Sequence, residues 1–209
     1  MNASKNDSLN EGFLVEKLKN VFCLLGKISF FELILKLFKI NSRSLFVEKW
    51  VIGNLLVAVI GSILVYSNPS ISISWLLMIY AIVRVFEIVI YQLNVTLFDP
   101  LKPNYSIESG TRLLILLLIN YIEMIFWYTI ILLSIMNIKQ IGTTSNWISY
   151  VTSSFYCFST YDSNRMLANG DMFLSLVSVE IVTGLIMSVL SIARCISLLP
   201  VADERRGKK

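Results

Sequence analysis

The chain contains no histidine among its 209 residues. This absence excludes catalytic triads that use an imidazole base and every metal site with a histidine ligand. Cysteine is scarce too. Cys23, Cys157 and Cys195 fall on different predicted elements, at different depths, which argues against a disulfide within the chain. No group of acidic residues has the spacing of metal ligands. We therefore expect no enzymatic activity, no cofactor and no bound metal.

Charged residues are few, at 15% of the chain, whereas hydrophobic residues make up 56% and the mean hydropathy is +0.70. These values lie well outside the range of ordinary soluble domains. Apolar runs long enough to cross a bilayer occur at residues 45–67, 72–93, 112–138 and 172–196. The sequence thus predicts an all-α membrane protein with four transmembrane helices.

The basic residues are distributed unevenly around these runs. Many lie before Trp50, in the 94–111 loop and at the C-terminal end, whereas the opposite side of the membrane has only Lys139 and Arg165. By the positive-inside rule, both termini and the loop are cytoplasmic. We expect a multi-pass protein of the inner or plasma membrane. The net charge is +4, and the excess basic residues lie next to the membrane, where anionic lipid attracts Lys and Arg. The charge therefore does not call for a nucleic-acid partner.

The chain divides into four segments. Residues 1–44 mix Leu, Phe, Ile and Val with Lys at helical spacing, which predicts two amphipathic helices on the membrane surface, or a collar packed against other subunits. Residues 45–111 form a peripheral two-helix transmembrane unit with its cytoplasmic loop. Residues 112–199 form a second membrane module, and residues 200–209 form a basic cytoplasmic tail.

The second module contains a stretch that is too short, and too rich in aromatic and polar residues, to span a bilayer. It reads Asn146-Trp-Ile-Ser-Tyr-Val-Thr-Ser-Ser-Phe-Tyr-Cys-Phe-Ser-Thr-Tyr-Asp162, and the apolar run after it contains Glu180-Ile-Val-Thr-Gly184. This order of outer helix, short helix, Ser/Thr-rich stretch and inner helix with a glycine resembles the pore domain of the potassium-channel superfamily, over residues 112–198. The resemblance implies a re-entrant pore helix, a homotetramer around a central pore, and a filter-like segment at Phe158, Ser159, Thr160, Tyr161 and Asp162.

The filter of that family depends on glycines, whose backbone freedom lets main-chain carbonyls form ion sites. Here no glycine lies between Gly142 and Gly170. No residue is therefore assigned as a potassium ligand, and we expect residues 158–161 to avoid the left-handed backbone, which is costly with a Cβ. Side chains would then line the narrowest part of a non-selective or weakly cation-selective pore. The alternative for the short stretch is an aromatic interfacial helix that only joins two spans.

Ionisable residues inside apolar runs indicate function or pairing, because an isolated charge is costly there. Arg84 and Glu87 lie three residues apart, on one helical face, and Glu123 lies near the middle of the third run. One interpretation is an ion-pair network that joins the peripheral unit to the second module. The other is a voltage sensor, which is disfavoured because Arg84 is not followed by further arginines at every third residue.

Two residues of the fourth run also have two interpretations each. Glu180 could lie behind the short helix and accept hydrogen bonds from its hydroxyl groups, or line the pore as an acidic ring that favours cations. Gly184 is a hinge of the inner helix if the resemblance holds, and otherwise a position where helices pack closely.

Two functions follow from these features. The first is an oligomeric, ion-channel-like pore, with a cytoplasmic protein as a possible partner that signals through residues 1–44. The alternative is a non-conducting membrane anchor or sensor subunit of a multi-protein system. Bacterial antiviral defence systems of the Kiwa type, for example, contain four-span oligomers of this general size.

Overall fold

The computed structural model describes residues 43–67, 70–98, 110–142, 145–161 and 171–198, together with Lys17. The amphipathic helices expected before residue 43 lie outside this range, apart from Lys17, which is helical. The basic tail of residues 200–209 and Asp162 also lie outside the described residues.

Within the described residues, four helices are long and apolar enough to cross a membrane. The α-helical segments of these spans begin and end within two residues of the limits expected from the sequence, so the four predicted spans are confirmed as helices. A shorter helix, α6, lies between the third and the fourth. The helices are α3 (Arg43–Ser67), α4 (Ile71–Leu93), α5 (Gly110–Ile138), α6 (Trp147–Phe158) and α8 (Asp171–Leu198).

Helix α4 continues beyond Leu93 as a π-helical turn, η1 (Asn94–Phe98), where the sequence predicted the start of a loop. The N–H of Asn94 bonds to the carbonyls of Ile90 and Tyr91, so the backbone hydrogen bonds continue without a break past Leu93. The guanidinium of Arg194, on α8, donates to the carbonyl of Val95 at 3.3 Å. The sequence prediction of a loop after Leu93 is therefore corrected to a further helical turn, which this contact with α8 holds in place.

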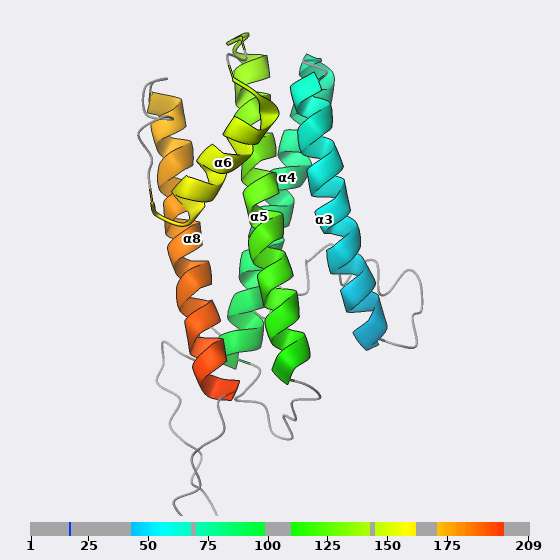
Figure 1. Ribbon diagram of the computed structural model, residues 1–209, viewed down its shortest axis with the longest axis vertical. Coiled ribbons are helices and arrows are strands. Elements are labelled where there is room, and N and C mark those ends of the chain that lie inside the picture. The colour runs from blue at the N-terminus through cyan, green and yellow to red at the C-terminus, as the bar shows by residue number, and fades with distance from the viewer. Residues whose placement is uncertain are drawn as a thin grey trace, which may run out of the picture.

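Helix α5 is the centre of the bundle. It packs against α3, α4, α6 and α8, and 61% of its apolar 18-residue stretch is buried, compared with 33% to 39% for the corresponding stretches of the other three spans. Figure 1 shows α3 on one side of α5, α8 on the other, and α4 crossing behind. The start of α3 and the end of α8 lie together at one end of the bundle, the lower end of Figure 1. We call the opposite end, where α6 begins, the upper end.

Polar contacts anchor the start of α6 at the upper end. Asn137 Nδ2, on α5, donates to the Val65 carbonyl of α3 at 3.0 Å and to Ser74 Oγ of α4 at 3.2 Å. The indole N–H of Trp147, on α6, donates to Ser62 Oγ of α3 at 3.2 Å. The first turn of α6 is thereby attached to α3, across the top of α5.

From this anchor, α6 runs diagonally downward across α5 to α8 (Figure 1). Its last residue, Phe158, packs against Gly184 of α8. Gly184 lies within one residue of the midpoint of the apolar span Phe173–Ser197. Helix α6 therefore ends halfway along a helix that is long enough to cross the membrane.

Helices α5 and α6 end in the same way, with a residue in the left-handed conformation. Thr160 has φ 61° and Gln140 has φ 56°. After α6, the N–H of Thr160 bonds to the Cys157 carbonyl and that of Tyr161 to the Tyr156 carbonyl, the pattern of a Schellman motif. The expectation that residues 158–161 avoid the left-handed backbone is thus wrong for Thr160, because this pattern satisfies carbonyls at the helix end.

A left-handed conformation costs a residue with a Cβ about 1–2 kcal/mol. We therefore expect Thr160→Gly to raise the free energy of unfolding by about 1 kcal/mol, and Gln140→Gly to raise it less, because glutamine is not β-branched. Thermal unfolding of the detergent-solubilised protein measures both. Ser159→Gly is the control: Ser159 has φ −84°, and glycine there should lower stability. An equal rise in all three variants would contradict the explanation.

Candidate functional site

Buried acidic side chains lie at two places in the bundle. One cluster joins α3, α4 and α5 around Arg84, and the other lies where α6 meets α8, around Glu180. Both lie within spans that are long enough to cross a membrane. Polar groups in such positions need partners from the protein, because hydrocarbon offers none.

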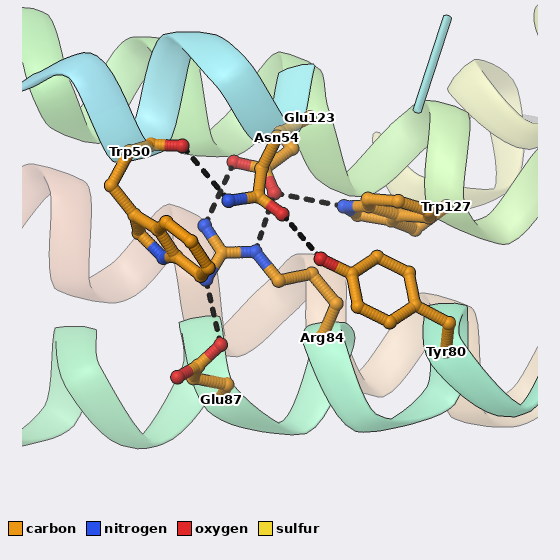
Figure 2. Close-up of polar contacts among 7 residues, drawn as sticks. All are labelled: Trp50, Asn54, Tyr80, Arg84, Glu87, Glu123 and Trp127. Carbon is orange, nitrogen blue, oxygen red and sulfur yellow. Dashed lines mark hydrogen bonds and ion pairs between the residues drawn. The ribbon is translucent and has the colours of Figure 1, made fainter. Parts of the chain in front are cut away.

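Arg84 is the centre of the first cluster and is only 5% exposed. Its Nε donates to Glu123 Oε1 at 2.7 Å and its Nη2 to Glu123 Oε2 at 3.3 Å, which makes a bidentate pair between α4 and α5. Its Nη1 donates to Glu87 Oε2 at 2.7 Å, within α4. The ion-pair network predicted from the sequence is present (Figure 2). A guanidinium held by three such bonds is poorly placed to move as a voltage sensor.

Two tryptophans complete the surroundings of this ion pair. The indole N–H of Trp127 donates to Glu123 Oε1 at 2.8 Å, so this oxygen accepts two hydrogen bonds. The guanidinium carbon of Arg84 lies 5.7 Å from the ring centre of Trp50, within cation–π range. Trp50 lies on α3, and the charge on α4 is therefore in contact with both neighbouring helices.

A second layer of hydrogen bonds joins α3 to α4 beside the ion pair. Tyr80 donates its hydroxyl to Asn54 Oδ1 at 2.7 Å, and Asn54 Nδ2 donates to the Trp50 carbonyl at 2.8 Å (Figure 2). Sequence reasoning missed these partners and the two tryptophans. The available signal was spacing: each helix carries its members four residues apart, on one face. The pairs are Trp50 with Asn54, Tyr80 with Arg84, and Glu123 with Trp127.

A cleft of about 40 Å³ opens beside Arg84 and Glu87. Asn120 lines it and is 2% exposed, and its Oδ1 has no hydrogen-bond partner among the described residues. The cleft has room for water or another small polar group. No cluster of three potential metal ligands occurs anywhere in the ranges that the structure describes.

Glu180 is the centre of the second cluster and is fully buried. The hydroxyl of Ser154, on α6, lies close enough to this carboxyl to act on it as a hydrogen-bonding group. However, neither carboxylate oxygen of Glu180 nor Ser154 Oγ makes a hydrogen bond of ordinary geometry with a described residue. Of the two predicted positions, the one behind the short helix matches the structure, and a hydroxyl of that helix lies beside the carboxyl, although not in ordinary hydrogen-bond geometry. A carboxyl with no exposed surface does not face a pore.

Gly184 follows Glu180 by one helical turn and lies under the end of α6. A Cβ at this position would overlap the carbonyl oxygen of Phe158. Thr183, beside it, accepts a hydrogen bond from the Tyr128 hydroxyl of α5 at 2.8 Å. Three helices thus meet within one turn of α8, and Gly184 is where two of them pack closely.

The filter-like residues do not share one surface. The ring of Phe158 is fully buried and packs 4.7 Å from that of Tyr121 and 6.1 Å from that of Tyr128, measured between centroids. This position differs from the pore-lining role expected for Phe158, because the last turn of α6 directs the ring towards α5. Thr160 is exposed and Tyr161 is 78% exposed. Ser159 is half-buried, and its hydroxyl donates to the Phe155 carbonyl at 2.7 Å.

We expect Arg84→Leu to destabilise the protein by about 3–5 kcal/mol, because it leaves buried carboxylates without their partner. Adding Glu123→Leu should restore part of that loss, so the double variant should be more stable than the sum of the single changes implies. Thermal unfolding in detergent measures the cycle. Trp127→Phe, which removes one hydrogen bond and keeps the ion pair, is the matched control and should cost about 1 kcal/mol. Strict additivity of the Arg84 and Glu123 changes would contradict the pairing.

Gly184→Ala should lower the free energy of unfolding by about 3 kcal/mol, because a backbone atom of α6 must move to admit the methyl group. Gly53, on α3, is the matched control: a Cβ there meets nothing within 4 Å, and Gly53→Ala should be neutral or slightly stabilising. Unfolding midpoints of the two variants make the comparison. Equal midpoints would mean that Gly184 does not serve close packing, and would favour the hinge.

Comparisons of this chain with protein families, with characterised proteins and with solved structures find no match, so its function has to be argued from its own geometry.

Proposed function

We propose that this chain is one subunit of an oligomeric, ion-channel-like membrane pore, non-selective or weakly cation-selective, in which α6 is a re-entrant pore helix. One observation carries the proposal. The helix α6 enters from the upper end, and its C-terminal residue packs against Gly184, at the middle of the last span. A helix that only joined two spans along the membrane surface would not reach this depth.

The residues that follow α6 support a wet environment at that depth. Ser159, Thr160 and Tyr161 leave the helix and turn away from the core, with Thr160 and Tyr161 exposed. Irregular backbone and hydroxyl groups at mid-membrane are tolerated only where they are buried in protein or line a water-filled cavity. In a single subunit they would face lipid. A second subunit, or a shared aqueous vestibule, removes this conflict.

A closed ring is the simplest assembly that gives every subunit the same environment. By the order of its elements the module of α5, α6 and α8 suits a homotetramer, with the α6 ends around the axis and α3 and α4 at the periphery. The Arg84–Glu123 pair suits a fixed support, because it attaches α4 to the central helix α5. Selectivity would then come from side chains at the mouth: the hydroxyls of Ser159 and Thr160 and an acidic ring of Asp162. A mouth lined in this way would pass hydrated ions with a modest charge preference.

Native mass spectrometry in detergent should show a homotetramer, and the protein reconstituted in planar bilayers should conduct. In opposed potassium and sodium gradients, we expect a reversal potential near zero, because no carbonyl cage selects potassium. Thr160→Val should change the conductance, since it removes an exposed hydroxyl at the mouth. Thr152→Val is the matched control, because the Thr152 hydroxyl is already bonded to the Ile148 carbonyl. Asp162→Asn should reduce any preference for cations.

Strong selection of potassium would contradict the side-chain-lined mouth but not the pore. A monomer or dimer would remove the channel proposal. A tetramer that never conducts would favour the second role, a membrane anchor or sensor subunit of a multi-protein system such as antiviral defence of the Kiwa type. Co-purification with a cytoplasmic protein that depends on residues 1–44 would support that role directly.

A further inference from the structure

We propose that Glu180 is a proton-binding site, and that its neutral, protonated carboxyl is what allows α6 to pack against α8. The site would operate whether or not the protein conducts ions. The proposal depends on the position of Glu180 inside the contact between α6 and α8, and on the charges and hydroxyl groups around its carboxyl.

The carboxyl of Glu180 lies inside the contact between α6 and α8. Ser154 and Phe158 are one turn apart on one face of α6, and Glu180 and Gly184 are one turn apart on one face of α8. Phe158 packs on Gly184, and Ser154 faces Glu180. Since Glu180 and Ser154 are both fully buried, the carboxyl cannot reach lipid headgroups or solvent while this contact is closed.

The described cations that pack near α8 or lie within the bundle are engaged elsewhere. The amine of Lys139 lies 5.6 Å from the ring centre of Phe173, two turns before Glu180. Arg194 binds the Val95 carbonyl near the other end of α8, and Arg84 is held by its two glutamates. The titratable side chain of α5 that faces Glu180 is Tyr128, and its hydroxyl already donates to Thr183.

A buried carboxylate without a counter-charge or hydrogen bonds is strongly unfavourable, and such a group binds a proton instead. A divalent metal ion fits less well, because it needs several oxygen ligands, and no group of three potential metal-ligating side chains occurs in the described ranges. A proton needs one oxygen lone pair. The ligand that suits this site is therefore the proton, bound as the O–H of a neutral carboxylic acid.

Loss of that proton would place a negative charge between α6 and α8. The carboxylate can be hydrated only if the helices separate, so ionisation and the opening of this contact are coupled. The proton passes to water at the upper end, since Glu180 lies about 14 Å along α8 from its first residue, at about 1.5 Å per residue. Alkaline conditions on that side would thus release the end of α6 from Gly184.

The chain offers a thiol that reports on this contact. Cys157 precedes Phe158 on α6, is 1% exposed and forms no disulfide, whereas Cys195 near the end of α8 is exposed. The full-length protein in lipid nanodiscs is alkylated with N-ethylmaleimide from mildly acid to mildly alkaline pH. At each pH, wild type is compared with Glu180→Gln, a neutral side chain of the same size, so that the pH dependence of the thiol itself cancels. We expect equal alkylation of Cys157 at acid pH and several-fold faster alkylation in wild type at alkaline pH, with Cys195 unchanged.

A second measurement needs no variant. Dicyclohexylcarbodiimide modifies protonated carboxyls in apolar surroundings, and mass spectrometry of the wild-type protein should locate the adduct at Glu180, in an amount that falls several-fold as the pH rises. Absence of the adduct at every pH would overturn the proposal. Loss of the adduct when sodium or potassium is added at constant pH would also overturn it, because the ligand would then be a metal cation. Equal alkylation of Cys157 in wild type and Glu180→Gln at all pH values would refute the coupling to helix packing.

Discussion

Hydrocarbon offers no hydrogen-bond partner, and this constraint governs the polar contacts between the helices of the bundle. Arg84, Asn137 and Trp147 each lie on a different helix, and each donates a hydrogen bond to another helix. Such bonds within a membrane contribute about 0.6–2 kcal/mol each, and they have direction, which apolar contacts between helix and lipid lack. They therefore fix how the spans are oriented around α5, while the outward apolar side chains of α3 and α4 remain available to lipid.

The two buried acidic clusters satisfy this constraint in opposite ways. Glu123 accepts two hydrogen bonds from Arg84 and one from Trp127, so its carboxyl oxygens have partners within the protein. Glu180 accepts none of ordinary geometry from the described residues. The first arrangement has one favourable state and suits a support between the peripheral helices and α5. The second changes its energy with the binding of one proton, and it lies at the contact that holds the end of α6. The rigid cluster thus lies where α5 meets α3 and α4, and the cluster that responds to a proton lies where α6 meets α8.

Sequence reasoning located the spans, the short helix at Trp147–Phe158 and the Arg84–Glu87–Glu123 network, because each depends on composition or on spacing along one helix. It missed Asn54, Tyr80 and Trp127, which join the network only because three helices meet at one level. It also assigned Phe158 to a pore surface, although the ring turns into the core against Tyr121. Which way a helix faces depends on crossing angles and contacts with non-adjacent helices. No local pattern encodes those in a run where nearly every residue is apolar.

The left-handed conformation of Thr160 shows that the absence of glycine does not exclude a left-handed backbone at a position. The steric cost of about 1–2 kcal/mol is real, but it is small beside what a helix end loses if its last carbonyls stay unbonded in an apolar environment. In the Schellman motif, the N–H groups of Thr160 and Tyr161 donate to two of those carbonyls, of Cys157 and Tyr156. The backbone therefore adopts the conformation despite the β-branched side chain. Because the carbonyl of Phe158 is turned towards Gly184, at least one carbonyl of this segment is directed into the helix bundle.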